Sequence, residues 1–308
     1  MDKIKNELVK NKVDFIEDFD VCEISSIRIS QIIKFAIFPK TIKEFEFVLK
    51  LFYKSKKQYK VVGGASNILF VSMITFPVIF TSKMKEEYII SKNMVTVSAG
   101  MSLAKFIDIL KRNRLGGIEK LVGIPATIGG AIFNNASAFG CEISSKLVSV
   151  RAFYEGEIVE ILAKDIKFGY HFSNLKGIVV IAASFLFENK NEYDIISLCN
   201  EFTYKRTVLQ PNGFSLGSVY QRINNNSAGF YIERAGLKQC RVGGIVVSKK
   251  HANFFVNDKN GTTKDFLELQ RIVENSVEKQ FGLSLVSEIE KVGEENEITS
   301  RSPHAFKL

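Results

Sequence analysis

Two glycine-rich segments in the first half of this 308-residue chain could bring bare backbone against a ligand. The first, at residues 63–67, has the sequence Gly-Gly-Ala-Ser-Asn and lies between two apolar runs of strand character. Glycine lets the main chain come within hydrogen-bonding distance of a phosphate, and successive N–H groups form an anion-binding nest. If it stood alone, this loop would be better explained as an ordinary tight turn.

The second segment, residues 123–136, is also built mainly of small residues. Two such segments within about seventy residues favour a large, flat ligand that carries a pyrophosphate, because bulky side chains would hold the main chain away from it. A glycine-rich hairpin that merely packs closely is the alternative. Neither segment has the pattern of a P-loop, and no Gly-x-Gly-x-x-Gly opens a helix after a strand, so nucleotide hydrolases and the Rossmann fold are disfavoured.

The elements that must position these segments are strands and helices that do not strictly alternate, which predicts an α+β fold. Thr41 is expected to cap a helix, with Glu44 three residues later completing a capping box. Further helices are expected at residues 2–11, 102–112, 195–206, 228–235 and 264–280. Strands are expected at residues 59–62, 68–71, 78–80, 94–99, 148–162, 179–187, 218–220 and 252–256. Residues 115–140 hold too many glycines for a regular element, so a close-packed loop is expected there.

The composition excludes several classes of protein. Hydrophobic residues make up 46% and charged residues 24% of the chain, which is ordinary globular usage. The net charge of +9 is spread over short runs without interleaved aromatic residues, so a solvated surface explains it better than nucleic-acid binding. No apolar stretch suits a membrane span or a secretory signal, which predicts a cytoplasmic protein without membrane insertion. The four cysteines form no Cys-x-x-Cys pair, so neither a metal site nor a disulfide framework is expected.

Taken together, the glycine-rich segments and several motifs in the second half resemble the UDP-N-acetylenolpyruvoylglucosamine reductase family. The matching residues, in the family's order, are 63–69, 116–119, 123–138, 210–211, 217–220, 228–229, 232–233, 235–238, 247–254 and 285–289. They extend over nearly the whole chain, which is far more specific than any one motif. The length and the short run between residues 173 and 210 are similar to the shorter subtype of this family.

The resemblance implies a two-lobed FAD-binding domain of the vanillyl-alcohol-oxidase kind and a smaller α+β substrate-binding domain. The expected boundaries are residues 20–200 for the first domain, with its lobes divided near residue 85, residues 206–293 for the second, and a tail at 294–308. The implied FAD contacts come from both glycine-rich segments: Gly63, Gly64, Ala65, Ser66, Asn67, Gly123, Ile124, Pro125, Thr127, Gly129, Gly130, Asn135 and Ala136. No histidine or cysteine lies within either segment to attach the flavin covalently.

The implied reaction is the reduction of UDP-N-acetylglucosamine enolpyruvate to UDP-N-acetylmuramate, a step of peptidoglycan precursor synthesis, with NADPH as reductant and FAD as carrier. Hydride addition to the vinyl carbon drives negative charge into the adjacent carboxylate, so the site must supply donors or cations there. A proton must also reach the neighbouring carbon. By resemblance, Ser218 donates that proton and Glu288 orients or protonates the intermediate. A turn serine and an exposed carboxylate are the plain structural alternatives for these two residues.

The sequence departs from the family at the residue that would stabilise the developing charge. The family motif Tyr-Arg-x-Ser occurs here at residues 170–173 with His171 in place of the arginine. A histidine with an ordinary pKa of about 6.5 is only fractionally charged near neutrality and lacks the guanidinium fork. Three interpretations follow: a protonated His171 substitutes, Arg222 substitutes, or turnover is impaired. Even spacing would put Arg222 on the face of Ser218 if residues 218–222 are extended.

Three side chains in the second half are candidate contacts for the substrate: Arg222, Lys238 and His251. For His251 a structural hydrogen-bonding role is equally open. The expected partner is a UDP-sugar and not a nucleic acid, and the protein is expected to be a monomer. The alternative function is a homologue that binds flavin or nucleotide sugar and has lost reductase activity, which the missing arginine favours.

Overall fold

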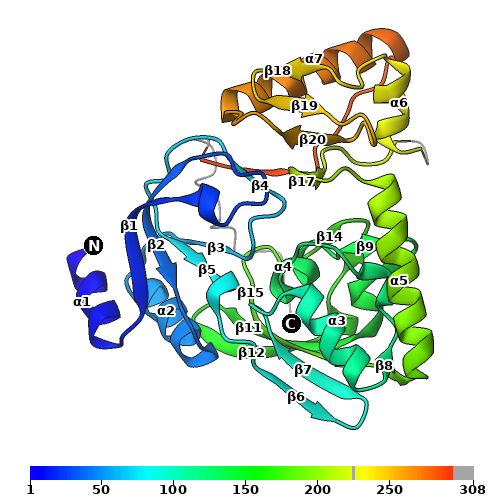
Figure 1. Cartoon of the computed structure of the whole chain (residues 1–308). Helices are drawn as coiled ribbons and strands as arrows, with labels where there is room; N and C mark the ends of the chain where they lie inside the picture. The colour runs from blue at the N-terminus through cyan, green and yellow to red at the C-terminus, as the bar shows by residue number, and fades with distance from the viewer. Residues whose placement is uncertain (224–225, 294–308) are drawn as a thin grey trace.

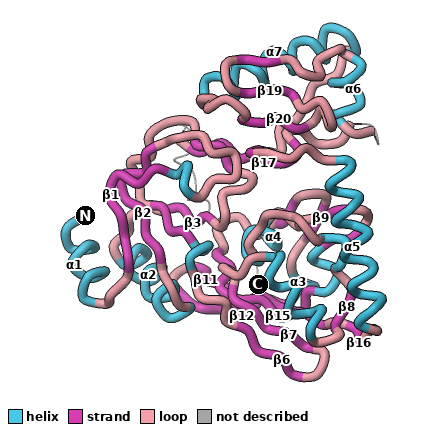
Figure 2. The backbone as a smooth tube through the Cα atoms, viewed as in Figure 1, coloured by secondary structure: helices cyan, strands magenta, loops and turns pink. Residues whose placement is uncertain are grey.

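The computed structural model describes residues 1–223 and 226–293, so the predicted tail at 294–308 lies outside the described residues. The chain folds into three parts around a common opening, and the long helix α5 (Glu192–Leu209) runs along one of them toward the C-terminal part (Figures 1 and 2). Within the described ranges, no helix has both the length and the apolarity needed to cross a membrane.

The first part, the N-terminal lobe, is a four-stranded sheet covered by helices. Its elements are α1 (Asp2–Lys10), β1 (Asp14–Asp20), β2 (Ile32–Phe38), α2 (Ile42–Lys54), β3 (Lys60–Val62), β4 (Ile68–Phe70) and β5 (Val78–Phe80). The order β1-β2-β5-β3 combines one antiparallel pair with parallel strands, and β4 stands outside this sheet. Thr41 caps α2 as predicted by accepting from the Glu44 amide, but the Glu44 carboxylate accepts from the Lys40 amide and so does not close the predicted box.

The second part, the central lobe, is built on an antiparallel sheet of five strands in the order β12-β11-β15-β7-β6. Its main elements are β6 (Tyr88–Ser91), β7 (Met94–Ser98), α3 (Leu103–Arg112), α4 (Ile128–Phe133), β11 (Leu147–Tyr154), β12 (Glu157–Leu162) and β15 (Val179–Leu186). Its short strands are β8 (Leu115–Gly116), β9 (Ser137–Ala138), β10 (Cys141–Glu142), β13 (Phe168–Gly169), β14 (Phe172–Ser173) and β16 (Glu188–Asn189). The apolar faces of this sheet and of α3 and α4 form one buried core.

The helix α4 lies where the sequence predicts only a loop. Thr127 caps it by accepting from the Gly130 amide, which satisfies a donor that would otherwise be orphaned at the helix start. A Cβ on Gly129 would lie 3.0 Å from the Cβ of Ala99, so glycine allows the helix to sit directly against the end of β7. The same glycines that argue against a helix by propensity therefore permit this one by close packing.

The third part, the C-terminal part, has a four-stranded antiparallel sheet backed by two helices. Its elements are β17 (Phe214–Ser218), α6 (Ala228–Arg234), β18 (Arg241–Val242), β19 (Ile245–Val247), β20 (Phe254–Asn257) and α7 (Thr263–Phe281), with the strand order β17-β20-β19-β18. A last strand, β21 (Glu290–Val292), leaves this part and pairs in parallel with β4 of the N-terminal lobe. The chain therefore returns to the loop that carries the first glycine-rich segment.

Candidate active site

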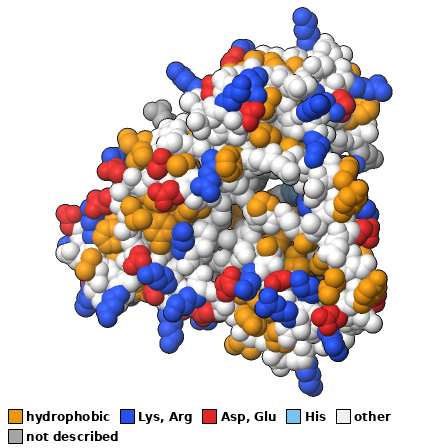
Figure 3. All heavy atoms as spheres, viewed as in Figure 1, with side chains coloured by type: hydrophobic (Ala, Val, Ile, Leu, Met, Phe, Trp, Pro, Cys, Tyr) orange, Lys and Arg blue, Asp and Glu red, His pale blue; other side chains and the backbone are white. Residues whose placement is uncertain are grey.

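A cleft of about 1710 Å³ lies between the three parts, and Figure 3 shows the surface hollowed where they meet. This volume exceeds the roughly 300–1,000 Å³ of ordinary small-molecule sites, so the cleft has room for more than one ligand. The residues that line it come from many segments, among them 58–68, 123–139, 170–171, 210–218 and 287–290. Segments far apart in the sequence thus share one cavity.

The first glycine-rich segment enters the cleft between β3 and β4. Ala65 has a φ of 48°, in the left-handed region, which marks a sharp change of chain direction. The backbone amides of Gly64, Ala65 and Ser66 donate to no other group in the described part of the chain. Three neighbouring N–H groups at a cavity wall suit an anionic ligand such as the pyrophosphate of FAD.

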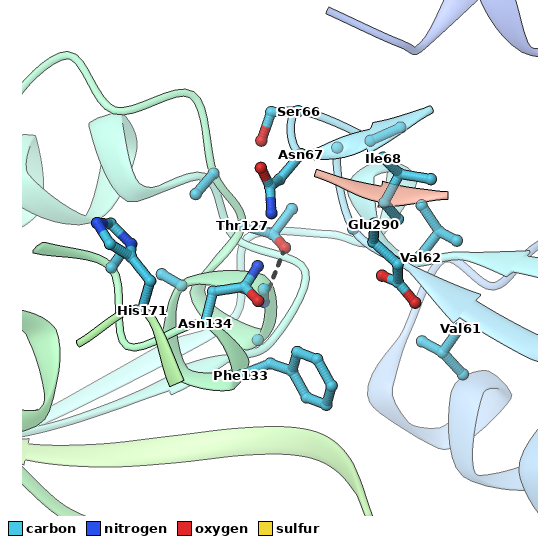
Figure 4. Close-up of a pocket in the computed structure, with 18 of the residues that line it drawn as sticks. Val61, Val62, Ser66, Asn67, Ile68, Thr127, Phe133, Asn134, His171 and Glu290 are labelled. Carbon is cyan, nitrogen blue, oxygen red and sulfur yellow. Dashed lines mark hydrogen bonds between the residues drawn. The ribbon is translucent and has the colours of Figure 1, made fainter. Parts of the chain in front are cut away.

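The two glycine-rich segments touch each other. A Cβ on Gly63 would collide with the hydroxyl of Thr127, so only glycine allows this approach. Figure 4 shows Ser66 and Asn67 across from Thr127 and Asn134, with His171 on one flank and Glu290 on the other. The other predicted FAD contacts that line the same cleft are Ile124, Pro125, Gly129, Gly130 and Ala136, together with Gly123 at a φ of 82°.

Asn135 is the exception among the predicted FAD contacts. Its side chain is fully buried, and its amide donates to the Glu142 carboxylate at 3.0 Å and to the Gly169 carbonyl at 2.9 Å. It is not among the described residues that line the cleft. Its side chain therefore holds the β13–β14 hairpin from behind, and the structure does not support the predicted contact with FAD.

Ser218 and Glu288 reach the cleft from two adjacent segments of the C-terminal part. Ser218 ends β17, where it pairs with Phe254 of β20. The Glu288 amide donates to the Val219 carbonyl at 2.8 Å, which sets the Glu288 segment beside the residue that follows Ser218. Both side chains line the cavity that the glycine-rich segments also line. The sequence predicts these two residues as a pair, and the fold brings them together.

The Glu288 carboxyl has an environment suited to proton transfer. Burial raises its pKa to about 7, an effect that hydrogen bonding to Tyr170 partly offsets. Its Oε1 atom has no hydrogen-bond partner among the described residues. Burial and the Glu288 charge also raise the pKa of Tyr170, while the charge of Arg222 acts in the opposite direction. A carboxyl whose pKa lies near neutrality is suited to act as an acid or a base.

His171 lies at the tip of the two-residue turn between β13 and β14 and lines the cleft. Its φ of 48° is in the left-handed region, and its Nε2 lies 3.5 Å from the Ser137 hydroxyl. Burial lowers its pKa, and the charge of Glu142 only partly opposes this. The imidazole is therefore largely neutral at pH 7, which argues against the interpretation that a protonated His171 replaces the family arginine.

The structure places the three predicted substrate contacts in different surroundings. Arg222 is exposed and is not itself among the described cleft-lining residues, but its charge reaches Tyr170, which is. The strand β17 ends at Ser218, yet the chain beyond it stays bridged to the Glu288 segment, since Tyr220 pairs with Ser287 and the Gln221 amide donates to the Val286 carbonyl at 2.9 Å.

Lys238 and His251 are not among the described cleft-lining residues. The Lys238 ammonium is paired with Glu233 at 2.5 Å, and His251 Nδ1 accepts from the Asn253 amide at 3.2 Å. The structure therefore shows local partners for these two residues, and their predicted contacts with the substrate stay predictions.

Arg206, on α5, is a cleft residue that sequence reasoning missed. Its Nε donates to the Val122 carbonyl at 2.5 Å, and its guanidinium stacks 5.3 Å from the ring centroid of Phe139. Burial lowers its pKa, and its second terminal nitrogen has no hydrogen-bond partner among the described residues. It fixes the start of the second glycine-rich segment. The only signal in the sequence is a lone arginine four residues before Gln210, which is too common to interpret.

Comparisons with known proteins agree with this geometry. Residues 33–161 match the family described as "FAD binding domain", and residues 210–292 match "UDP-N-acetylenolpyruvoylglucosamine reductase, C-terminal domain". A relative of that name from Caldicellulosiruptor bescii is 33% identical, with 93% of each chain covered. One from Streptococcus pyogenes serotype M12 is 36% identical and covers 84% of this chain and 90% of its own. The crystal structure of the Thermus caldophilus reductase matches 91% of this chain and 98% of its own, with a TM-score of 0.77 at 26% identity.

The two-lobed fold, the bare-backbone cleft and the matched domain define an FAD-binding protein of the α+β class with a smaller C-terminal domain. The predicted fold class is confirmed. Because relatives more than 30% identical cover most of the chain, it belongs to the UDP-N-acetylenolpyruvoylglucosamine reductase family, as the sequence motifs predict.

Proposed function

We propose that this chain reduces the enolpyruvyl group of UDP-N-acetylglucosamine enolpyruvate to give UDP-N-acetylmuramate, with FAD as the bound carrier and NADPH as the reductant. Family membership supports the reaction, and the matched FAD-binding domain supports the cofactor. One observation carries the proposal: Ser218 and Glu288 share a single cleft with the exposed backbone of both glycine-rich segments. The net charge of +9 suits ligands that carry diphosphates.

The residues that would hold FAD are those that offer backbone to the cleft. The unpaired amides of Gly64, Ala65 and Ser66 suit its pyrophosphate, and the segment that begins at Gly123 provides a second wall without bulky side chains. FAD held there would supply hydride transfer from NADPH to the vinyl carbon of the substrate. The glycine-rich segments thus contribute close backbone approach, and Ser218 and Glu288 contribute side chains from the C-terminal part.

Ser218 and Glu288 are the residues we assign to proton transfer. A serine hydroxyl is a weak acid, so it donates its proton to a developing carbanion only where neighbouring groups stabilise the alkoxide that forms. A protonated Glu288 beside it can donate a hydrogen bond or a proton, and burial keeps that form available up to about pH 7. The carboxyl therefore suits the role of orienting or protonating the intermediate.

We assign the positive charge that the reaction needs to Arg222. A guanidinium is a permanent cation, and the charge of Arg222 reaches Tyr170, which hydrogen-bonds to Glu288. His171 is left as a neutral hydrogen-bonding group, since burial lowers its pKa. This choice follows from charge: a neutral imidazole cannot offset the negative charge that hydride addition drives into the substrate carboxylate.

The working unit we propose is one chain. Residues 20–200 form the FAD-binding domain, divided near residue 85, and residues 206–293 form the substrate-binding domain. A single copy contributes every segment described above as lining the cleft, which supports a monomer. NADPH and UDP-sugars are cytoplasmic metabolites, which supports a cytoplasmic location. The comparisons give no support to the alternative of a binding homologue that has lost turnover.

An anaerobic two-step titration tests the function. The purified protein should be yellow, NADPH should bleach the flavin absorbance, and the enolpyruvyl substrate should then restore it in a stoichiometric amount. Mass spectrometry should show a product two hydrogens heavier than the substrate. A colourless protein, or a flavin that stays reduced after the substrate is added, would contradict the proposal. Rapid reoxidation by oxygen alone would instead indicate a flavin oxidase.

A further inference from the structure

The strand β21, the last within the described residues, pairs with the strand that follows the first glycine-rich segment. β21 pairs with β4 in parallel, so that Glu290 lies opposite Ile68 and Val292 opposite Phe70. The Glu290 amide donates to the Asn67 carbonyl at 3.0 Å, and the Val71 amide donates to the Val292 carbonyl at 2.8 Å. The segment that contains Glu288 is therefore hydrogen-bonded to the loop at residues 63–67, called the cofactor loop below.

Two side chains clamp this strand, one at each end of the pairing. Asn67 Nδ2 donates to the Glu288 carbonyl at 2.9 Å, and Ser72 Oγ donates to the Gly293 carbonyl at 2.7 Å. Both bonds join the N-terminal lobe to the same returning strand. They differ in what they hold, because only the Asn67 bond reaches the residue whose carboxyl lines the cleft.

The Glu288 backbone is fixed on its other side by the C-terminal part. Its amide donates to the Val219 carbonyl at 2.8 Å, and two residues earlier the Val286 carbonyl accepts from the Gln221 amide at 2.9 Å. The N–H of Glu288 is thus set by the strand end that carries Ser218, and its C=O by the cofactor loop. Other bonds, such as that from Thr263 Oγ1 to the Phe70 carbonyl, also join the N-terminal lobe to the C-terminal part, but the Asn67 side-chain bond is the one made to Glu288 itself.

We propose that Asn67 is a positioning residue for Glu288, so that the loop we assign to FAD also aligns the acid that acts on the substrate. The inference rests on the proposed function of Glu288. It gives the Asn67 side chain a role beyond the predicted contact with FAD, because its amide nitrogen donates to the Glu288 carbonyl. Since a shift of about 1 Å in a catalytic group can cost about 10²-fold in rate, losing this bond should slow the proton-transfer step.

Separate measurements of the two half-reactions test this role. In protein saturated with FAD, Asn67→Ala and Asn67→Ser should slow flavin reduction by NADPH much less than they slow reoxidation by the substrate. Reoxidation at saturating substrate should slow by about 10- to 100-fold, in keeping with a lost positioning contact. Ser72→Ala is the matched control, since it removes an equivalent side-chain bond to the same strand away from Glu288, and it should leave both half-reactions unchanged.

A double-mutant cycle shows whether Asn67 acts through Glu288. Glu288→Gln should itself slow reoxidation, and adding Asn67→Ala to it should then have little further effect. Additive effects, an equal loss in Ser72→Ala, or an equal slowing of both half-reactions would overturn the role of Asn67. The function proposed above fails in a different way: the flavin of the wild type would then stay reduced after the substrate is added, whatever the Asn67 variants do.

Discussion

The two walls of the cleft are built by opposite means. On the wall formed by the glycine-rich segments, the groups offered to a ligand are mainly backbone amides and small residues, and the approach of Gly63 to Thr127 leaves no room for a Cβ. The facing wall offers the side chains of Ser218 and Glu288, the second with a pKa raised to about 7. Binding thus depends on the absence of side chains on one wall, and chemistry depends on their identity on the other.

Among the variants that test this contrast, we expect the largest change in rate when the hydroxyl of Ser218 is removed. Ser218→Ala removes the proton donor and leaves the backbone wall intact, so NADPH should still bleach the flavin. Reoxidation by the substrate should slow by about 10²–10⁴-fold, the usual contribution of general acid catalysis. Stopped-flow absorbance of the prereduced protein measures this rate. Normal reoxidation in this variant would remove Ser218 from the mechanism.

The opposite test adds a side chain to the first glycine-rich segment. Gly63→Ala places a methyl group against the Thr127 hydroxyl, and overpacking of this kind costs about 1–3 kcal/mol. We expect FAD affinity to fall by about 5- to 150-fold, measured by fluorescence titration of the apoprotein, with the reoxidation rate of the FAD-saturated protein nearly unchanged.

Thr127→Ala supplies the control for that experiment. Alone it removes the cap of α4, and combined with Gly63→Ala it also removes the atoms that a Cβ at residue 63 would meet. Part of the lost FAD affinity should therefore return in the double variant. If the two losses simply add, the collision between the segments is not the cause.

A smaller effect should separate Arg222 from His171. Loss of a charged hydrogen-bond donor costs about 1.5–3 kcal/mol, so Arg222→Met should slow reoxidation by at least about tenfold. His171→Asn keeps a neutral polar group and should change the rate by less than about threefold. The comparison would be reversed if the imidazole were the working cation. In that case His171→Arg would also raise the rate and remove its dependence on pH near neutrality.

The smallest effects should come from titration of Glu288. If its protonated form is required, reoxidation should be constant well below pH 7 and fall by about tenfold per pH unit above it, while Glu288→Gln should lose this dependence.

The raised pKa of Glu288 also has a consequence for the stability of the folded chain. The stability that the protonated carboxyl contributes is complete below its ordinary pKa of 4.5 and is lost as the pH rises through about 7. The unfolding temperature of Glu288→Gln, measured relative to that of the wild type, should therefore be higher at pH 8 than at pH 5.

The contrast between the walls also explains which sequence predictions succeeded. Helical periodicity gave the right position for α2, for which the cap Thr41 was also predicted, and for α7, because such signals are local. The helix α4 was missed, since its glycines reflect packing against Ala99 and carry no helical signal of their own. For Lys238 and His251 the partners seen in the structure, Glu233 and the Asn253 amide, depend on side-chain direction, which a motif does not specify, and their predicted contacts with the substrate stay predictions.

The residue types on each wall, the order of the motifs and the family to which they belong were determined by the sequence itself, because spacing along the chain and backbone permissiveness are local properties. The tertiary structure decided what those residues face. Burial, which depends on every surrounding segment, makes His171 neutral and raises the pKa of Glu288. The return of β21 to β4 joins Asn67 to Glu288 across 221 positions of sequence, a contact that no local pattern encodes.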